Sequence, residues 1–161
     1  MTSAPLVLGF DLANRSLLAK NYPIIGNRAA IAINQAWGGH PGRLVKNASK
    51  TFVAAVGHGA GFDGCERMEG PRMVNICENI SFPVTQVWAK PLSATEHAVL
   101  LINLSEEPQS AGVTLAELGL SWGAAAAADV WTGKAAAGGV GRVGLPPHGS
   151  AFLRLRLTKR A

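Results

Sequence analysis

The clearest hydrophobic pattern in the chain is a period-two alternation close to its C-terminal end. Two sets of side chains should point to opposite faces of one strand: Ala151, Leu153, Leu155 and Leu157 on one face, and Phe152, Arg154, Arg156 and Thr158 on the other. This alternation predicts a strand with one buried and one solvent-exposed face. The two arginines are therefore interpreted as solvated surface residues.

Short strand-like stretches separated by turns precede this strand. Strands are expected over residues 96–104 and 126–131, and a single helical turn stopped by glycine is expected over 114–119. The alanine run 124–128 and the glycines at 138–141 are of low complexity, and we interpret them as loops or strand-flanking segments. Several short strands with regular turns are typical of an antiparallel β-sandwich.

The N-terminal part has a different pattern. An apolar run over residues 4–10 is typical of a strand that is buried on both faces. A short helix is expected to begin at 16–20 and to be broken or restarted at Pro23. Asn27 is a favourable N-cap for a second helix over 28–35. One strand followed by helices is a βα unit, which cannot bury both faces of its strand alone and therefore implies partners that this chain does not contain.

These patterns divide the chain into three parts. Residues 1–45 hold the βα unit, residues 46–84 form a loop-rich insertion or linker, and residues 85–161 form the antiparallel sandwich. Within the middle part, the stretches 51–56 and 72–77 have strand character, and glycines lie between them.

Length and composition fit a folded domain. The 161 residues are enough for one hydrophobic core, and 48% apolar with 16% charged residues argues against disorder. No apolar run approaches the roughly 18 residues that a membrane span needs, and the N-terminus does not resemble a signal peptide. The formal charge of +5 is spread along the chain, apart from a C-terminal cluster of Arg154, Arg156, Lys159 and Arg160. This predicts a mildly basic surface and no nucleic-acid partner.

The two cysteines, Cys65 and Cys77, lie in a segment rich in glycine and charge. An oxidising compartment favours a disulfide between them, whereas a cytosolic protein would keep two thiols. Four N-x-S sequons provide candidate glycosylation sites: Asn14, Asn47, Asn79 and Asn103. Together they favour a secretory route, to an extracellular, lysosomal or vacuolar destination.

Candidate catalytic groups are few. Asp11 follows the apolar strand, at the end where barrel enzymes place their sites. It is either adjacent to a substrate or a residue of the turn or helix cap that follows the strand. Asp129 is assigned a structural role within a strand. The four histidines, His40, His58, His97 and His148, lack metal-ligand spacing, so we predict no metal and no cofactor in this chain.

Two tryptophans have alternative interpretations. Trp88 and Trp131 could be sugar-binding platforms, or they could pack inside the sandwich. Both lie in strand-like apolar segments, which favours packing.

Five segments, taken in order, resemble the last part of an alpha-galactosidase of glycoside hydrolase family 27. They are the segments Ala4-Pro5-Leu6-Val7-Leu8-Gly9-Phe10-Asp11-Leu12, Ala30-Ile31-Ala32-Ile33-Asn34-Gln35, Gln86-Val87-Trp88-Ala89-Lys90-Pro91-Leu92, Asp129-Val130-Trp131-Thr132-Gly133-Lys134 and Pro146-Pro147-His148-Gly149-Ser150-Ala151-Phe152-Leu153-Arg154-Leu155. The resemblance covers residues 4–45 and 85–157. It implies a mainly β chain, in which a C-terminal antiparallel β-sandwich is preceded by the last βα unit of a (β/α)8 barrel.

The resemblance also implies a chemistry and its place. The family's catalytic pair are two aspartates on the fourth and sixth barrel strands, and their motifs have no counterpart in this sequence. The resemblance therefore implies no catalytic residue in this chain. On this hypothesis the full-length enzyme hydrolyses terminal α-D-galactosyl residues with retention, while this chain by itself is inactive and needs the missing barrel half as its structural partner. Galactoside would bind only to the full-length enzyme. Close relatives act on α-N-acetylgalactosamine or β-arabinopyranose, so the sugar preference stays open. The alternative is a stand-alone β-sandwich module that binds carbohydrate or another protein.

Overall fold

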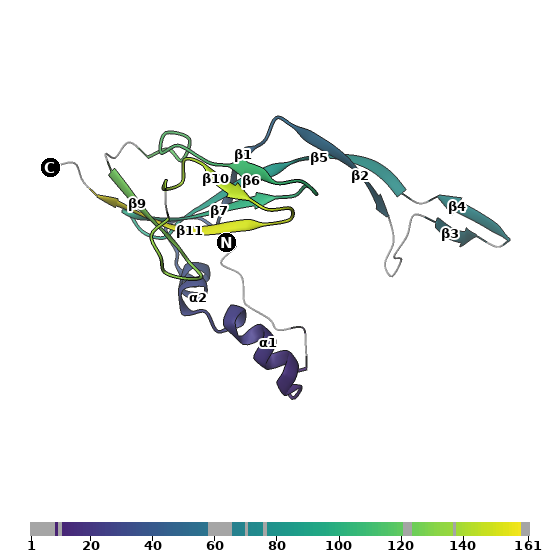
Figure 1. The fold of residues 1–161 in the computed structure, drawn as a ribbon, viewed down its shortest axis with the longest axis horizontal. Coiled ribbons are helices and arrows are strands. Elements are labelled where there is room, and N and C mark those ends of the chain that lie inside the picture. The colour runs from purple at the N-terminus through teal and green to yellow at the C-terminus, as the bar shows by residue number, and fades with distance from the viewer. Residues whose placement is uncertain are drawn as a thin grey trace.

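The computed structural model describes residues 9, 11–57, 66–69, 71–75, 77–120, 124–136 and 138–158. Two helices are followed by strands (Figure 1): α1 (Arg15–Ile25), α2 (Arg28–Gln35), β1 (Arg43–Asn47), β2 (Thr51–Gly57), β3 (Glu66–Glu69), β4 (Arg72–Asn75), β5 (Cys77–Pro83), β6 (Thr85–Pro91), β7 (Glu96–Asn103), β8 (Gln109–Ala111), β9 (Ala124–Asp129), β10 (Val143–Leu145) and β11 (Ser150–Thr158). The strand predicted over residues 4–10 lies outside the described residues, apart from Gly9.

Both helices begin at an asparagine cap. The Asn27 side chain accepts a hydrogen bond of 3.0 Å from the Ala30 amide, which confirms the predicted cap of α2. Asn14 caps α1 in the same way, with 3.1 Å to the Leu17 amide. The expected break at Pro23 is wrong, because α1 continues through it to Ile25. Proline removes one amide donor, but the Gly26 amide still donates to the Tyr22 carbonyl at 2.8 Å and closes the last turn.

The sandwich is built on one five-stranded antiparallel sheet, in the order β1-β6-β7-β11-β9. A smaller two-stranded sheet, β10-β8, forms the second layer. The strand expected over 96–104 is β7, and it pairs with β6 on one side and β11 on the other. The antiparallel β-sandwich predicted from the pattern of strands is therefore confirmed.

The main hydrophobic core lies between these two layers. The inner face of the large sheet contributes eight buried side chains: Val87, Ala89, Val99, Leu101, Ala127, Leu153, Leu155 and Leu157. The opposite layer and its loops cover them with Ala111, Val113, Leu118, Val140 and Leu145. Full burial of a leucine or valine side chain contributes roughly 1.5–3 kcal/mol relative to its exposed state, so this core accounts for the alternation along β11.

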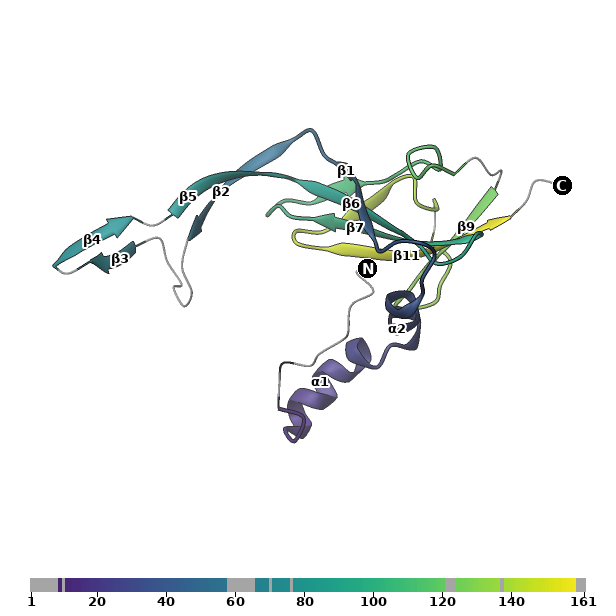
Figure 2. The same cartoon turned by 180° about the vertical axis from the view of Figure 1, so that it is seen from behind.

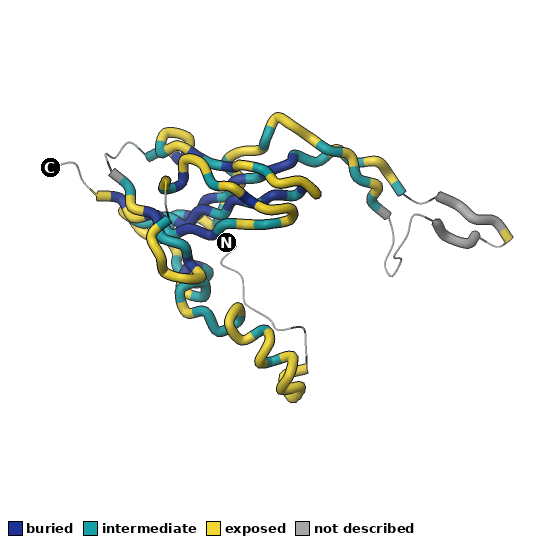
Figure 3. Tube along the Cα trace, in the orientation of Figure 1, coloured by how far each residue is buried: buried dark blue, intermediate teal, exposed yellow. Residues whose placement is uncertain are grey.

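A second, smaller core lies on the outer face of the same sheet, where α2 packs (Figures 1 and 3). Ile33 of α2 meets Ala98, Val130 and Phe152 there, and Phe152 is 8% exposed. The alternation had predicted that the outer face of β11 is solvent-exposed. Part of that face is instead buried. Alternation along one strand shows that the two faces differ, but it does not reveal a helix that covers part of the polar face.

The alanine run 124–128 is not a loop. It forms most of β9, which pairs with β11 along its whole length, with Ala127 buried in the main core. The strand predicted over 126–131 therefore begins and ends two residues earlier than expected. Asp129 ends it, because its carboxylate Oδ1 accepts hydrogen bonds of 2.8 Å from both the amide and the hydroxyl of Thr132 and turns the chain.

The segment between β1 and β6 extends from the sandwich as an arm of paired strands (Figures 1 and 2). β2 pairs with β5 over seven residues, with the rings of Phe52 and Phe82 5.8 Å apart, and β3 pairs with β4. The expected strand over 51–56 is confirmed as β2. The stretch 72–77 is not one strand, because β4 ends at Asn75 and β5 begins at Cys77. The boundaries proposed at 45/46 and 84/85 stay predictions.

Candidate functional site at the junction of helix α2 and the sandwich

Lys90 is the most unusual side chain at the junction between the helices and the sandwich. It lies on β6 and is 0% exposed. Its ammonium Nζ donates hydrogen bonds to two backbone carbonyls of α2, at 2.6 Å to Ile33 and 2.9 Å to Asn34. Burial lowers the pKa of this ammonium from its ordinary value of 10.5. A buried cation is costly unless it is hydrogen-bonded, and here the last turn of α2 provides the acceptors.

A carboxylate that is paired with two arginines lies next to the same helix. Glu96 at the start of β7 contacts Arg154 at 2.5 Å and Arg156 at 2.9 Å, both from β11. The hydrogen bond from Arg154 lowers the pKa of the Glu96 carboxyl, burial opposes that shift, and the hydrogen bond from Arg156 adds to it. Arg156 is solvent-exposed as predicted, whereas Arg154 is half-buried and ion-paired.

A cavity of about 260 Å³ lies at this contact, between α2 and the large sheet. Its lining comes from α2 and the residues after it on one side and from the sheet on the other: Ala32, Ile33, Ala36, Leu92, Glu96 and Arg154.

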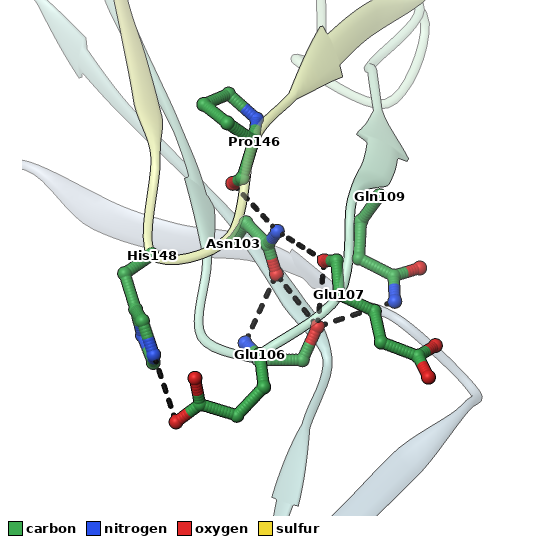
Figure 4. A network of polar contacts seen from close by, with 7 residues as sticks. Asn103, Glu106, Glu107, Gln109, Pro146 and His148 are labelled. Atoms are coloured by element: carbon green, nitrogen blue, oxygen red, sulfur yellow. Dashed lines mark hydrogen bonds and ion pairs between the residues drawn. The ribbon is translucent and has the colours of Figure 1, made fainter.

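Figure 4 shows a buried polar network at the opposite end of β7. Asn103 is 1% exposed, and its side-chain nitrogen donates to the carbonyls of Glu107 at 2.7 Å and Pro146 at 2.8 Å. Its side-chain oxygen accepts from the amide and the hydroxyl of Ser105, both at 2.9 Å. Asn103 therefore joins the loop after β7 to the turn before β11.

That turn is the Pro146-Pro147-His148-Gly149 motif. The Gly149 amide donates to the Pro146 carbonyl at 2.9 Å, and a Cβ at Gly149 would lie 2.6 Å from the Pro146 ring. Glycine is therefore needed for this close approach. His148 adopts a φ of 53° and places its Nε2 3.0 Å from a Glu106 carboxylate oxygen. The role of the motif that these contacts show is to fix the backbone conformation of the turn.

The candidate glycosylation sites differ in accessibility. Asn14, Asn47 and Asn79 are exposed, so glycosylation at these residues stays a prediction. Asn103 is incompatible with it in the folded domain, because the nitrogen that would carry the glycan is buried and donates to backbone carbonyls. Cys77 begins β5, while Cys65 lies outside the described residues, so their disulfide also stays a prediction.

Asp11 lies in the turn that leads into α1. It is exposed, its Oδ1 accepts a hydrogen bond of 2.9 Å from the Ala13 amide, and its carbonyl accepts one of 3.2 Å from Asn14. These contacts belong to the turn alternative, although Asn14 rather than Asp11 caps the helix. Contact between Asp11 and a substrate remains a prediction.

The two tryptophans occupy different surroundings. Trp88 of β6 is half-buried and donates from Nε1 to the Gln86 side chain at 3.1 Å. Trp131 lies in the turn after β9 and is 44% exposed, with its ring 5.9 Å from the ring of Phe152. Trp131 thus borders the small core under α2 and keeps part of its ring in solvent.

A separate cleft of about 450 Å³ is lined by residues of β1, β6 and β8 and of the loops next to them. The polar residues in its lining carry hydroxyl, amide and ammonium groups, and they include Lys46, Lys50, Ser49, Ser110 and Gln109. Within the part of the chain that the structure describes, no group of three or more His, Cys, Asp or Glu side chains could hold a metal ion. In the same residues, no helix is long and apolar enough to cross a membrane.

These observations define an antiparallel β-sandwich domain that holds a preceding helix on its outer face. Residues 84–155 match the family described as the alpha galactosidase C-terminal beta sandwich domain. Over these residues the chain is similar to the C-terminal β-sandwich domain of alpha-galactosidases, as the sequence motifs had indicated. No curated protein matches the sequence.

Solved structures are similar over nearly the whole chain. Alpha-galactosidase I from Mortierella vinacea has a TM-score of 0.63 at 18% identity, covering 98% of this chain and 34% of that one. A putative alpha-N-acetylgalactosaminidase from Bacillus halodurans has 0.64 at 17%, covering 97% and 29%. The alpha-galactosidase from Saccharomyces cerevisiae with raffinose has 0.61 at 20%, covering 97% and 41%. At these identities the likeness shows the fold, and this chain spans less than half the length of each of them.

Proposed function

We propose that this chain forms the C-terminal part of an alpha-galactosidase-like glycoside hydrolase. The complete enzyme would hydrolyse terminal α-D-galactosyl residues with retention, using two carboxyl groups about 5–5.5 Å apart. Support comes from the family match over residues 84–155 and from structural neighbours that cover the helices as well as the sandwich. On this proposal, residues 1–45 hold the last βα unit of a (β/α)8 barrel.

The observation that carries the proposal is the packing of α2 on the outer face of the large sheet. Ile33 is buried against Phe152, and Lys90 reaches across to the end of the helix. A self-contained sandwich module has no need to bury a lysine against a preceding helix. A sandwich that anchors the end of a barrel does, because the two domains must keep one relative position. This contact favours the enzyme over the stand-alone binding module.

The carboxylates near the sandwich support a structural rather than a catalytic role for this chain. Asp129 accepts hydrogen bonds from Thr132, Glu96 is paired with two arginines, and Glu117 binds Lys46 at 2.7 Å. Each of these groups is held by contacts within the fold. We therefore place the catalytic aspartates in the missing barrel, and galactoside would bind only to the complete enzyme. Asp11 is the residue of this chain proposed to lie nearest to the substrate.

The cellular compartment of the full-length protein is part of the same proposal. A secretory route, ending outside the cell or in a lysosome or vacuole, would allow Cys65 and Cys77 to pair and the exposed sequons to carry glycans.

The test compares two proteins. The 161-residue chain and the product of the longest reading frame that contains it would be purified and assayed with an aryl α-galactoside. The proposal predicts hydrolysis by the longer protein and none by the chain alone. Turnover by the 161-residue chain would contradict the location of the catalytic groups. A longer protein that carries a barrel but leaves α-galactosides intact would contradict the activity.

A further inference from the structure

The C-terminal turn of α2 has acceptors that its own helix cannot satisfy. The last four carbonyls of any α-helix lack intrahelical donors. In α2 the Ala32 carbonyl is used by the Ala36 amide at 2.9 Å, but the carbonyls of Ile33 and Asn34 lie beyond it. The described last turn of α2 contains no basic side chain that could bind them. Carbonyl groups at a helix C-terminus carry partial negative charge, so they attract a cation.

Lys90 supplies that cation from a different element, 57 residues further along the chain. Its Nζ lies 2.6 Å from the Ile33 carbonyl and 2.9 Å from the Asn34 carbonyl. The side chain is 0% exposed and Ile33 is 2% exposed, so the contact is shielded from water. Hydrogen bonds from a charged donor are stronger than neutral ones, and a low local dielectric strengthens them further.

The segment after α2 is held at the same place. A Cβ at Gly38 would lie 2.7 Å from the carbonyl oxygen of Pro91, the residue that follows Lys90. The chain leaving α2 therefore passes directly over the end of β6, and only glycine fits that approach. Lys90 and Pro91 thus hold the helix end and the following segment from one point on the large sheet.

Helix α1 provides the contrast. None of its residues is buried, and Leu17, Tyr22 and Ile24 are exposed. Nothing comparable to the Lys90 contact is described for α1, although it is joined to α2 by a short link. Helix α2 is therefore held against the sandwich much more firmly than helix α1.

We infer that Lys90 is a positioning residue that holds α2 against the large sheet. As a result, α2 and the sandwich unfold as one cooperative unit, whereas α1 unfolds independently. The inference rests on the proposed function only where it names α2 as the end of a barrel. There it means that the sandwich holds the last barrel unit through this buried ammonium as well as through the apolar contacts of Ile33.

Hydrogen exchange of backbone amides in the 161-residue chain tests this. In the wild-type chain, the amides of residues 31–36 should be protected about as well as those of β7 and β11, and the amides of α1 should exchange fast. Lys90→Met should speed exchange in α2 about tenfold or more, because two carbonyls at a helix end lose a charged donor. Exchange in β7 and β11 should change much less. Lys90→Arg should restore the protection of α2.

Two further variants make the outcome unambiguous. Lys20→Met removes an exposed lysine of α1 and should leave α2 unchanged. Gly38→Ala keeps Lys90 but displaces the segment next to Pro91, and it should loosen α2 even if Lys90→Met does not fold. The inference is overturned if α2 stays protected in Lys90→Met or in Gly38→Ala. It is also overturned if β7 and β11 lose as much protection as α2. None of these readouts depends on hydrolysis, so an inactive full-length protein would contradict the proposed function and leave this inference standing.

Discussion

The side-chain nitrogen of Asn103 lies 2.8 Å from the carbonyl oxygen of Pro146, 43 residues away in the sequence. The contact joins the loop after β7 to the turn that starts β11, and the same amide also binds the Glu107 carbonyl and the Ser105 amide. Replacing a buried group of this kind leaves several partners unsatisfied, and each such partner costs about 1–3 kcal/mol.

Asn103→Ala should therefore lower the free energy of unfolding by about 2–4 kcal/mol. Asn103→Asp should be at least as damaging, because a carboxylate cannot donate to the two carbonyls. Denaturant unfolding measures both. Asn79→Ala, at an exposed position of β5, is the control and should stay within about 0.5 kcal/mol of the wild type. Equal stability of Asn103→Ala and the control would show that the network does not hold the loops together.

The Lys46–Glu117 pair predicts a pH dependence. Glu117 accepts hydrogen bonds from Lys46 at 2.7 Å and from the amide and hydroxyl of Thr114 at 2.8 Å and 3.1 Å. These contacts lower the pKa of the Glu117 carboxyl to about 2. A lowered carboxyl pKa stabilises the fold fully above the unfolded value of 4.5, and this stabilisation is lost as the pH falls toward 2.

Glu117→Gln should consequently unfold more easily than the wild type at pH 6, and the two proteins should approach each other near pH 2. Thermal unfolding at a series of pH values measures this convergence. Glu107→Gln is a matched control, because its pair with Lys50 is 3.9 Å long and both side chains are largely exposed. A gap between wild type and Glu117→Gln that stays constant with pH would contradict this account.

Three sequons are accessible and one is not, which gives a prediction about glycosylation. In a secretory host, removal of Asn14, Asn47 or Asn79 by substitution with Gln should abolish one glycan each, while the occupancy at Asn103 should be zero in folded protein. Mass spectrometry before and after enzymatic deglycosylation measures this. A glycan on Asn103 of the folded protein would contradict its buried position.

The cysteine pair predicts a covalent link within the arm. A disulfide between Cys65 and Cys77 would close a short loop and stabilise it by about 3 kcal/mol in the chain-entropy model. Non-reducing peptide mapping of protein from a secretory host should recover the two cysteines in one linked pair, and Cys77→Ser should remove it. Two alkylated thiols in the wild-type protein would contradict both the link and the secretory assignment.

Local signals in the sequence predicted local structure well. Asn27 caps its helix because the interaction is completed within three residues. The alternation along β11 predicted the main core, because each inward side chain meets the opposite layer directly. The alanine run was misjudged because alanine has little intrinsic preference for strands. It is a strand here because its backbone pairs with β11.

The junction could not be predicted in the same way. Lys90 is one lysine in a strand-like segment, and nothing near it in the sequence indicates that its partners are the carbonyls of Ile33 and Asn34. Asn103 matches a sequon because the sequon is defined by three consecutive residues. The structural role of the Asn103 side chain depends instead on a turn 43 residues away. Both side chains act through contacts that the tertiary fold creates, so a sequence pattern alone does not reveal them.

The stereochemistry of galactoside hydrolysis tests the central claim most directly. The full-length protein that contains this chain would be incubated with an aryl α-galactoside, and the first galactose anomer released would be followed by proton NMR before mutarotation. A retaining alpha-galactosidase releases α-galactose first. This account predicts that result for the full-length protein. Release of β-galactose first, or no hydrolysis of α-galactosides by a folded full-length protein, would contradict it.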